Sequence, residues 1–178
     1  KLIIMYELLK ELFPICRSIT GEGNRKTLKI IQKIIPKLKI KEIKSGTKVF
    51  DWKIPPEWNI YDAYVKDENG KKIIDFKKNN LHIVSYSEPV KKIIAKKELI
   101  KKLHSLPKQP NAIPYVTSYY NKYWGFCVSE TLKNKIKKSR SKYFNVVIDS
   151  SFKKKGSLTY AEYLIKGKSK KEILISTY

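Results

Sequence analysis

The chain has 178 residues, of which 42% are hydrophobic and 31% are charged, a composition typical of a folded protein and not of a disordered one. Its formal charge of +23 would suit a nucleic-acid-binding protein, but 36 of the 39 basic residues are lysine and only three are arginine, the residue that recognises bases and phosphates bidentately. We therefore expect no specific nucleic-acid partner.

The sequence shows no targeting or membrane segment. The first eleven residues are interrupted by Glu7, Lys10 and Glu11, so they lack the continuous apolar stretch of a secretory signal. No segment approaches the roughly 20 apolar residues of a membrane span. Cys16 and Cys127 are the only cysteines and lie far apart, which is typical of reduced thiols. We expect a cytoplasmic protein with no membrane partner.

Two helices are predicted at the N-terminus, the first ending before Pro14 and the second before Pro36. A polar, glycine-rich turn at residues 17–25 separates them. Their apolar residues recur at three- and four-residue steps. These residues are Leu2, Met5, Leu8, Leu9 and Leu12 in the first helix, and Leu28, Ile31, Ile34 and Ile35 in the second.

From Leu38 onward the sequence predicts a region rich in β-strands. Residues 61–65 and 72–76 alternate in polarity and flank Asn69 and Gly70, which is a strong hairpin signal. We therefore expect a β-hairpin here.

Residues 93–106 predict a short helix closed by prolines, whereas residues 132–140 are basic and poorly patterned. We interpret residues 132–140 as a linker or helix end, with a boundary nearby. Three further segments are predicted strands: residues 81–86, 116–120 and 124–128.

The last third predicts three strands, at residues 143–149, 158–166 and 172–176. A final strand with no helix to cover it would leave an apolar face and an unpaired edge. We therefore expect further protein beyond this sheet.

The glycine turn at residues 21–24 precedes a helix, so its amides could contact an anion or substrate. It lacks the lysine and serine of a phosphate loop and follows no strand. Loop and cap geometry is the preferred interpretation.

His82 and His104 have no second donor at three- or four-residue spacing, so no metal site is predicted. Cys127, Ser118 and Ser150 could serve as nucleophiles, but spacing pairs none of them with a base. Cys127 is better explained as a core thiol. We assign no catalytic residue and no metal ligand in this chain.

An aromatic cluster could stack a sugar or a base, but core or interface packing is the preferred interpretation. Its members are Tyr115, Tyr119, Tyr120, Tyr123, Trp124 and Phe126.

Five phrases occur in order along the chain. They are FPICRSITGEG at residues 13–23, WKIPPEW at 52–58, LP at 106–107, YWGFC at 123–127 and GSLTY at 156–160. Together they resemble the N-terminal part of bacterial aminopeptidase-like proteins that are often found with surface-polysaccharide biosynthesis genes, and whose core is similar to the zinc-dependent aminopeptidase fold. The resemblance covers essentially the whole chain.

The resemblance implies an α/β fold in three units. Residues 1–37 would be an N-terminal helical segment of the peptidase-like domain, and residues 38–140 an inserted β-rich α+β domain of unknown function. Residues 141–178 would be the first strands of an incomplete zinc-aminopeptidase-like mixed sheet. In such proteins the first metal-ligand histidine follows a strand ending like residues 175–178. The resemblance therefore implies no cofactor in this chain and zinc in the full-length protein.

The resulting prediction is an N-terminal fragment of a zinc-dependent aminopeptidase-like hydrolase, inactive alone, whose full-length form acts on a peptide or a small amide-containing substrate. We expect Arg17, Tyr119 and Trp124 to lie nearest the substrate. One alternative is a stand-alone accessory module that binds saccharide or peptide in surface-polysaccharide biosynthesis. Another is electrostatic tethering to nucleic acid, which salt would abolish. The sequence predicts no oligomeric state.

Overall fold

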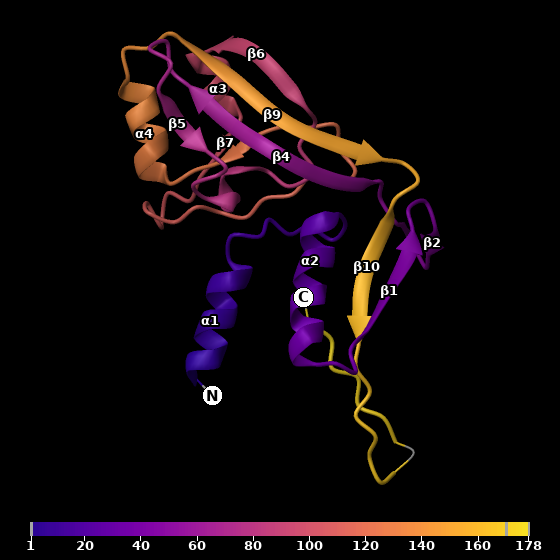
Figure 1. The fold of residues 1–178 in the computed structure, drawn as a ribbon. Coiled ribbons are helices and arrows are strands. Elements are labelled where there is room, and N and C mark those ends of the chain that lie inside the picture. The colour runs from indigo at the N-terminus through magenta and orange to yellow at the C-terminus, as the bar shows by residue number, and fades with distance from the viewer. Residues whose placement is uncertain (1, 170, 178) are drawn as a thin grey trace.

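The computed structural model describes residues 2–169 and 171–177 and shows a mixed α/β protein. A four-stranded sheet with short helices forms one part, which we call the sheet lobe (residues 57–153). Two N-terminal helices and a two-stranded ribbon form the other, which we call the helix–ribbon part (Figure 1). The expected α/β class is confirmed. An incomplete aminopeptidase-like sheet stays a prediction.

Both predicted N-terminal helices are present. They are α1 (Leu2–Leu12) and α2 (Glu22–Ile34). α2 buries Thr27 and Ile30, and it lies between the ribbon and α1 (Figure 1). The apolar spacing in the sequence therefore located both helices correctly.

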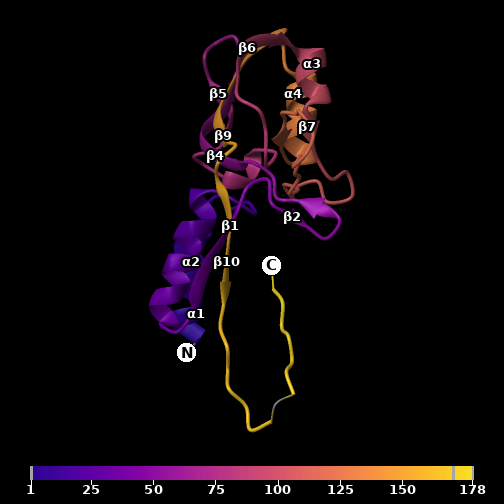
Figure 2. The same ribbon diagram turned by 90° about the vertical axis from the view of Figure 1, so that its right-hand side faces the viewer.

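The ribbon pairs β1 (Lys39–Lys44) with β10 (Ser157–Glu162) in antiparallel register, with Ile43 opposite Leu158. β10 confirms the first half of the strand predicted at 158–166. A small hairpin of β2 (Lys48–Val49) and β3 (Trp52–Lys53) follows β1. The chain enters the sheet lobe after β1 and leaves it before β10. The two connections therefore run side by side (Figure 2).

The sheet of the lobe is antiparallel, with strand order β5-β4-β9-β6. Its strands are β4 (Glu57–Lys66), β5 (Lys72–Asp75), β6 (Val90–Ala95) and β9 (Tyr143–Lys153). The predicted hairpin is β4 and β5. Asp67 Oδ1 accepts backbone N–H bonds from Asn69 and Lys71, and Gly70 takes a φ of 76°. The turn chemistry of the sequence therefore sets this register.

One face of the sheet is buried by the remaining elements of the lobe. These are α3 (Lys96–Lys101), α4 (Glu130–Lys138), the 3₁₀ turn η1 (Asn80–His82) and the parallel pair β7 (Leu103–His104) and β8 (Phe126–Cys127). Alternate residues of β9 point into this core. The core includes Trp58, Val65, Tyr86, Leu99, Phe126, Ile136, Phe144, Val146 and Ile148.

The helix predicted at residues 93–106 is wrong over most of its length. Residues up to Ala95 belong to β6, which pairs with β9, and only Lys96–Lys101 form a helix. Ile94 is buried and Ile93 is exposed, as strand alternation requires. Pairing with β9 therefore overrides a short apolar run that spacing alone cannot assign.

Four other local predictions also need correction. Residues 81 and 82 belong to η1, and the rest of the segment 81–86 and residues 116–120 form only isolated bridges, such as Ser85 with Thr117. Residues 124–128 shorten to β8. Residues 132–140 lie largely within α4, which Ser129 caps by accepting from the Leu132 N–H at 3.1 Å. Ser129, a residue type favoured as a helix N-cap, is the sequence signal that could have predicted this helix.

Residues 172–176 are not a strand in the structure. Ile173, Leu174 and Ile175 are all exposed. A strand needs a hydrogen-bonding neighbour, and no described segment pairs with these residues.

The division into units 1–37, 38–140 and 141–178 stays a prediction, and its outermost residues lie outside those described. β9 belongs by sequence to the third unit, yet it lies between β4 and β6 of the second. No helix among the described residues has the length and apolar character needed to span a bilayer.

Candidate functional site

The sheet lobe and the helix–ribbon part are joined by an ion pair between Arg25, in the first turn of α2, and Glu57, the first residue of β4. Arg25 Nη2 lies 2.6 Å from Glu57 Oε1, and Nη1 lies 3.1 Å from Oε2. The Glu57 side chain is 4% exposed and that of Arg25 is 16% exposed. A bidentate pair so far removed from water is the geometry in which arginine binds a carboxylate most strongly.

Two other acidic residues and one backbone group complete this pair. Glu22 Oε1 accepts from Arg25 at 2.7 Å, and Glu42 of β1 lies 3.6 Å from Arg25. The Ser157 backbone N–H of β10 donates to Glu57 at 3.1 Å. We call Arg25, Glu22, Glu42 and Glu57 the Arg25 cluster. It brings α2, β1, β4 and β10 together at one guanidinium.

The charges of the cluster are fixed by their partners. Burial alone would raise the pKa of the Glu57 carboxyl, but hydrogen bonds from Arg25, Asn59 and the Ser157 N–H outweigh it and lower the pKa to about 2. Hydrogen bonds to Glu57 and Glu22 raise the pKa of Arg25 above its ordinary value. Both groups stay charged at neutral pH, and a carboxylate of such low basicity is unsuited to general-base catalysis.

A second, uncharged contact lies beside the Arg25 cluster. Thr20 Oγ1 accepts from the Trp58 backbone N–H at 3.0 Å and lies 2.7 Å from the Tyr86 hydroxyl. The Trp58 indole N–H donates to the Ser87 carbonyl at 3.0 Å, and the rings of Trp58 and Tyr86 stack with centroids 5.7 Å apart. The turn before α2 is thereby anchored in the core of the sheet lobe.

The glycine turn is explained by close contact with β4. Gly21 has a φ of 92°, and a Cβ there would lie 2.2 Å from the Trp58 carbonyl oxygen. Asn59 Oδ1 accepts from the Glu22 N–H at 2.8 Å, so a side chain from β4 caps α2. This supports the interpretation of residues 21–24 as loop and cap geometry.

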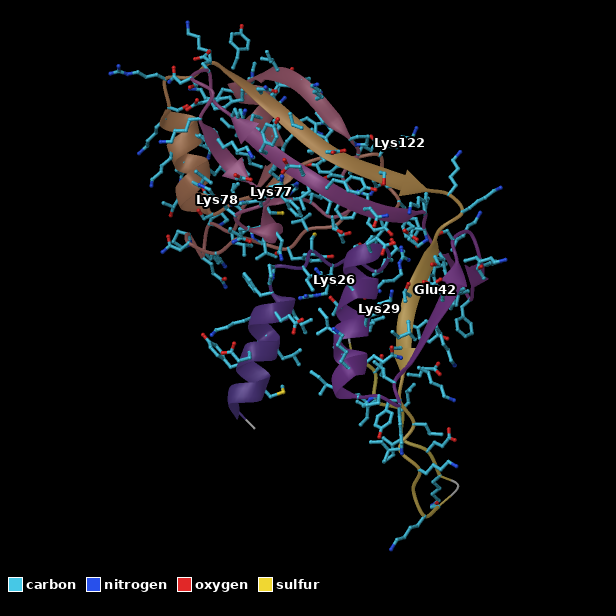
Figure 3. The ribbon with its side chains drawn as sticks, viewed as in Figure 1. Lys26, Lys29, Glu42, Lys77, Lys78 and Lys122 are labelled. Carbon is cyan, nitrogen blue, oxygen red and sulfur yellow. The ribbon has the colours of Figure 1, made fainter. Side chains whose placement is uncertain are left out.

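A depression of about 420 Å³ opens over the cluster. Figure 3 shows Glu42 on the ribbon and Lys26 and Lys29 on α2. Gly156 forms part of the wall, where a Cβ would lie 2.2 Å from the Glu57 Cβ. The lining residues are Arg25, Glu42, Lys44, Glu57, Lys153, Lys155, Gly156 and Ser157. The two carboxylates of its lining, Glu42 and Glu57, are both paired with Arg25, which suits a structural joint better than a reaction site.

The structure places Arg17 and Tyr119 in different surroundings. Arg17 is exposed and its Nη1 donates to the Leu12 carbonyl at 2.6 Å, at the end of α1. Tyr119 packs edge-on against Tyr86 with centroids 5.1 Å apart. Tyr119 thus touches the core next to the joint, and a substrate role for either residue stays a prediction.

Trp124 packs against the core of the sheet lobe, with Lys92 and Lys102 each 5.1 Å from its ring centroid. The rest of the aromatic cluster is divided. Phe126 is buried in the core, whereas Tyr120 is exposed and donates to a backbone carbonyl. The cluster therefore does not present one open stacking face. A substrate role for Trp124 stays a prediction.

Neither Arg25 nor Glu57 stands out by spacing, because they are 32 positions apart. Composition offers a usable signal. Arg25 is one of three arginines among 39 basic residues, and arginine is favoured where a planar fork must meet a carboxylate.

The surroundings of the three candidate nucleophiles do not activate them. Burial raises the pKa of the Cys127 thiol to about 12, so it stays protonated at neutral pH. The Ser118 hydroxyl lies 3.3 Å from the Ser85 carbonyl, and the Ser150 hydroxyl donates to the Ser87 carbonyl at 2.8 Å. Their partners are backbone carbonyls, which cannot act as bases.

The two histidines bind neighbouring groups of the lobe. His82 Nδ1 lies 2.8 Å from the Cys127 carbonyl oxygen, and His104 Nε2 lies 2.9 Å from the Tyr123 hydroxyl. Within residues 2–169 and 171–177, no three His, Cys, Asp or Glu residues lie close enough to hold a metal ion. These residues offer no donor set that fits zinc.

Comparison with known proteins identifies close relatives. Residues 57–151 match the family described as "Domain of unknown function (DUF2172)". A Clostridium acetobutylicum protein named "putative polysaccharide biosynthesis protein with aminopeptidase-like domain" is 55% identical over 174 residues, which are 98% of this chain and 39% of that protein. The crystal structure of a "putative peptidase" from Clostridium acetobutylicum, also 55% identical, matches with a TM-score of 0.84 over 92% of this chain and 38% of that one.

The chain therefore spans about two fifths of the length of the curated relative that it matches. The expected resemblance to aminopeptidase-like proteins of polysaccharide biosynthesis is confirmed. The stretch that matches the family, 57–151, begins at the first residue of β4 and ends within β9. It coincides with the sheet lobe.

Replacing Glu57 by Gln should lower the free energy of unfolding at pH 7 by about 3 kcal/mol, because it removes the charge that compensates the half-buried Arg25. In the native protein this contribution is complete above the ordinary carboxyl pKa of 4.5 and is lost as the pH falls towards about 2. Urea unfolding between pH 7 and pH 3 measures both effects.

Glu22→Gln is the control, because Glu22 binds the same guanidinium from an exposed position. It should cost below about 1 kcal/mol. If the native protein and Glu57→Gln lost the same amount of stability between pH 5 and pH 3, the buried pair would not be the source of the pH dependence.

Gly21→Ala and Gly70→Ala should differ although both sites have positive φ, 92° and 76°. Gly70 has no atom within 4 Å of a built Cβ, so alanine there should cost about 1 kcal/mol of stability. Gly21→Ala should cost at least about 2 kcal/mol more, because its Cβ meets the Trp58 carbonyl. Equal losses in thermal or urea unfolding would contradict the close approach.

Proposed function

This chain belongs to the DUF2172 family, and we propose that it is the N-terminal part of a longer, zinc-dependent aminopeptidase-like hydrolase of surface-polysaccharide biosynthesis. In this proposal the sheet lobe controls substrate access. The substrate class is a peptide or a small amide-containing molecule.

The observation that supports the proposal is the match to the Clostridium acetobutylicum relative. The identity is 55% over 98% of this chain, while only 39% of that protein is covered. Identity at this level over nearly the whole chain indicates a common architecture for this region. The activity named for such relatives would then depend on the part that this chain does not cover.

Zinc in such a protein would polarise an amide carbonyl and lower the pKa of a bound water. The described residues offer no donor set for it. The proposal therefore assigns the metal ligands and the general-base carboxylate to the uncovered part. We keep the cytoplasm as the compartment, because Cys16 and Cys127 are both free thiols.

The role of this chain is to hold the sheet lobe in a fixed orientation. The lobe has its own core and is inserted between β1 and β10, which pair with each other. Arg25 clamps the first residue of β4 onto α2. Ligand sites lie preferentially where domains meet, so a lobe fixed in this way would limit which substrates reach a neighbouring site.

The complete gene should be sequenced beyond codon 178 and expressed beside this chain. We expect a continuation rich in His and Asp ligands, stoichiometric zinc in the complete product, and hydrolysis of an aminoacyl amide by that product alone. A frame without such a continuation, or a metal-free and inactive complete product, would contradict the proposal.

Access control is tested with Glu57→Gln in the complete product. Bound zinc and kcat/KM for a small amide should change less than about threefold, whereas kcat/KM for a longer peptide should change about tenfold. Equal effects on both substrates would indicate that the lobe does not select among them.

A further inference from the structure

α1 carries an apolar surface that the described residues leave uncovered. Leu8 and Leu12 are half-buried, but Leu9 is 58% exposed and Phe13 is 64% exposed. We call Met5, Tyr6, Leu9 and Phe13 the exposed α1 stripe, since all four are exposed. Met5 and Tyr6 lie four and three residues before Leu9, and Phe13 lies four residues after it, just past the end of α1, so the four side chains follow one side of the helix. Met5 and Leu9, two of the five apolar residues whose spacing predicted this helix, are therefore exposed to solvent.

α1 is the outermost layer of the helix–ribbon part. In Figure 1 the ribbon, α2 and α1 lie in that order, and nothing drawn lies beyond α1 in this view. Its ties to the rest include a bond from the Asn80 side chain to the Phe13 carbonyl. An 11-residue helix is marginal in water unless its apolar side packs against protein. The exposed α1 stripe is thus a surface that needs cover.

A second apolar feature lies at the end of α2. Ile34 is exposed, and a hollow of about 400 Å³ is lined by Ile34, Ile35, Pro36, Lys37 and Tyr163. We call these residues the Ile34 hollow. α1 and α2 run in opposite directions (Figure 1), so the first turn of α1 and the last turn of α2 lie at the same end. The Met5 end of the exposed α1 stripe and the Ile34 hollow therefore lie at the same end of the helix–ribbon part.

The sheet lobe differs from the helix–ribbon part in its packing. It buries a continuous core of large side chains, among them Trp58, Tyr86, Phe126 and Phe144. The described residues outside the lobe bury few large apolar side chains: Ile30 and Ile54 are buried, and Thr20, Thr27 and Thr159 are buried polar residues. A layer of helices on a two-stranded ribbon is not a complete domain, because domains need two packed layers around a core. The shortage of buried apolar side chains is therefore confined to the helix–ribbon part, which carries the exposed α1 stripe.

We propose that the exposed α1 stripe and the Ile34 hollow together form a docking surface for the remainder of the same longer polypeptide. The length outside this chain argues for that occupant, since the 55% identical relative extends well beyond the 39% that this chain covers. A covalently attached domain has a high effective concentration and needs no charge complementarity to find the surface. The inference rests on the proposed function only in requiring a longer polypeptide.

Hydrogen exchange of the α1 amides tests this directly, in this chain and in the complete gene product. We expect α1 amides in this chain to exchange within about tenfold of the unfolded rate, and those of the complete product at least about a hundredfold more slowly. In the complete product, the double variant Leu9→Ser and Phe13→Ser should accelerate α1 exchange at least about tenfold.

The matched control is Ile93→Ser on β6, since Ile93 is 71% exposed but belongs to the sheet lobe. It should leave α1 exchange unchanged. Equal exchange of α1 in both proteins would overturn the proposal. Protection that rises with the concentration of this chain would also overturn it and would assign the surface to a second copy. A complete product that protects α1 but hydrolyses nothing would remove the proposed function and leave this inference standing.

Discussion

The bidentate pair of Arg25 and Glu57 is the contact on which the arrangement of this protein depends. Glu57 begins the strand that leads the chain into the sheet lobe, and Arg25 lies in the first turn of the helix that packs on the ribbon. Because the carboxylate is nearly inaccessible to water, it is stable only while the guanidinium is in place. Separation of the lobe from the helix would break this ion pair. The close contacts of Gly21 and Gly156 keep the two backbones near enough for this pair to form.

This joint gives physical meaning to the phrases that first indicated the family. Three of them, at residues 13–23, 52–58 and 156–160, are far apart in sequence but meet around Arg25, which lies two residues after the first phrase. Glu22 and Glu57 bind the Arg25 guanidinium, and the Asn24 side chain donates to the Thr159 carbonyl at 2.6 Å. The family match covers only the lobe that these phrases hold in place. A self-contained lobe clamped to an incompletely covered helical layer supports our proposal that this chain is one part of a longer protein.

Sequence patterns predicted the parts of the fold that depend on local interactions. Apolar spacing located both N-terminal helices, and Asn69 with Gly70 located the hairpin of β4 and β5. Patterns failed where distant pairing decides the structure. Ile93 and Ile94 form a strand because they pair with β9. Residues 172–176 form no strand, because no described strand lies beside them to pair with. The joint itself was missed for the same reason, since a contact between residues 32 positions apart leaves no local period.

A double-mutant cycle with Arg25→Met and Glu57→Gln, followed by urea unfolding at pH 7, measures the central interaction most directly. If the pair holds the two parts together, the single variants should lose more stability in sum than the double variant, with a coupling free energy of about 2 kcal/mol or more. Additive losses within about 0.5 kcal/mol would show that the residues are neighbours without a joint role.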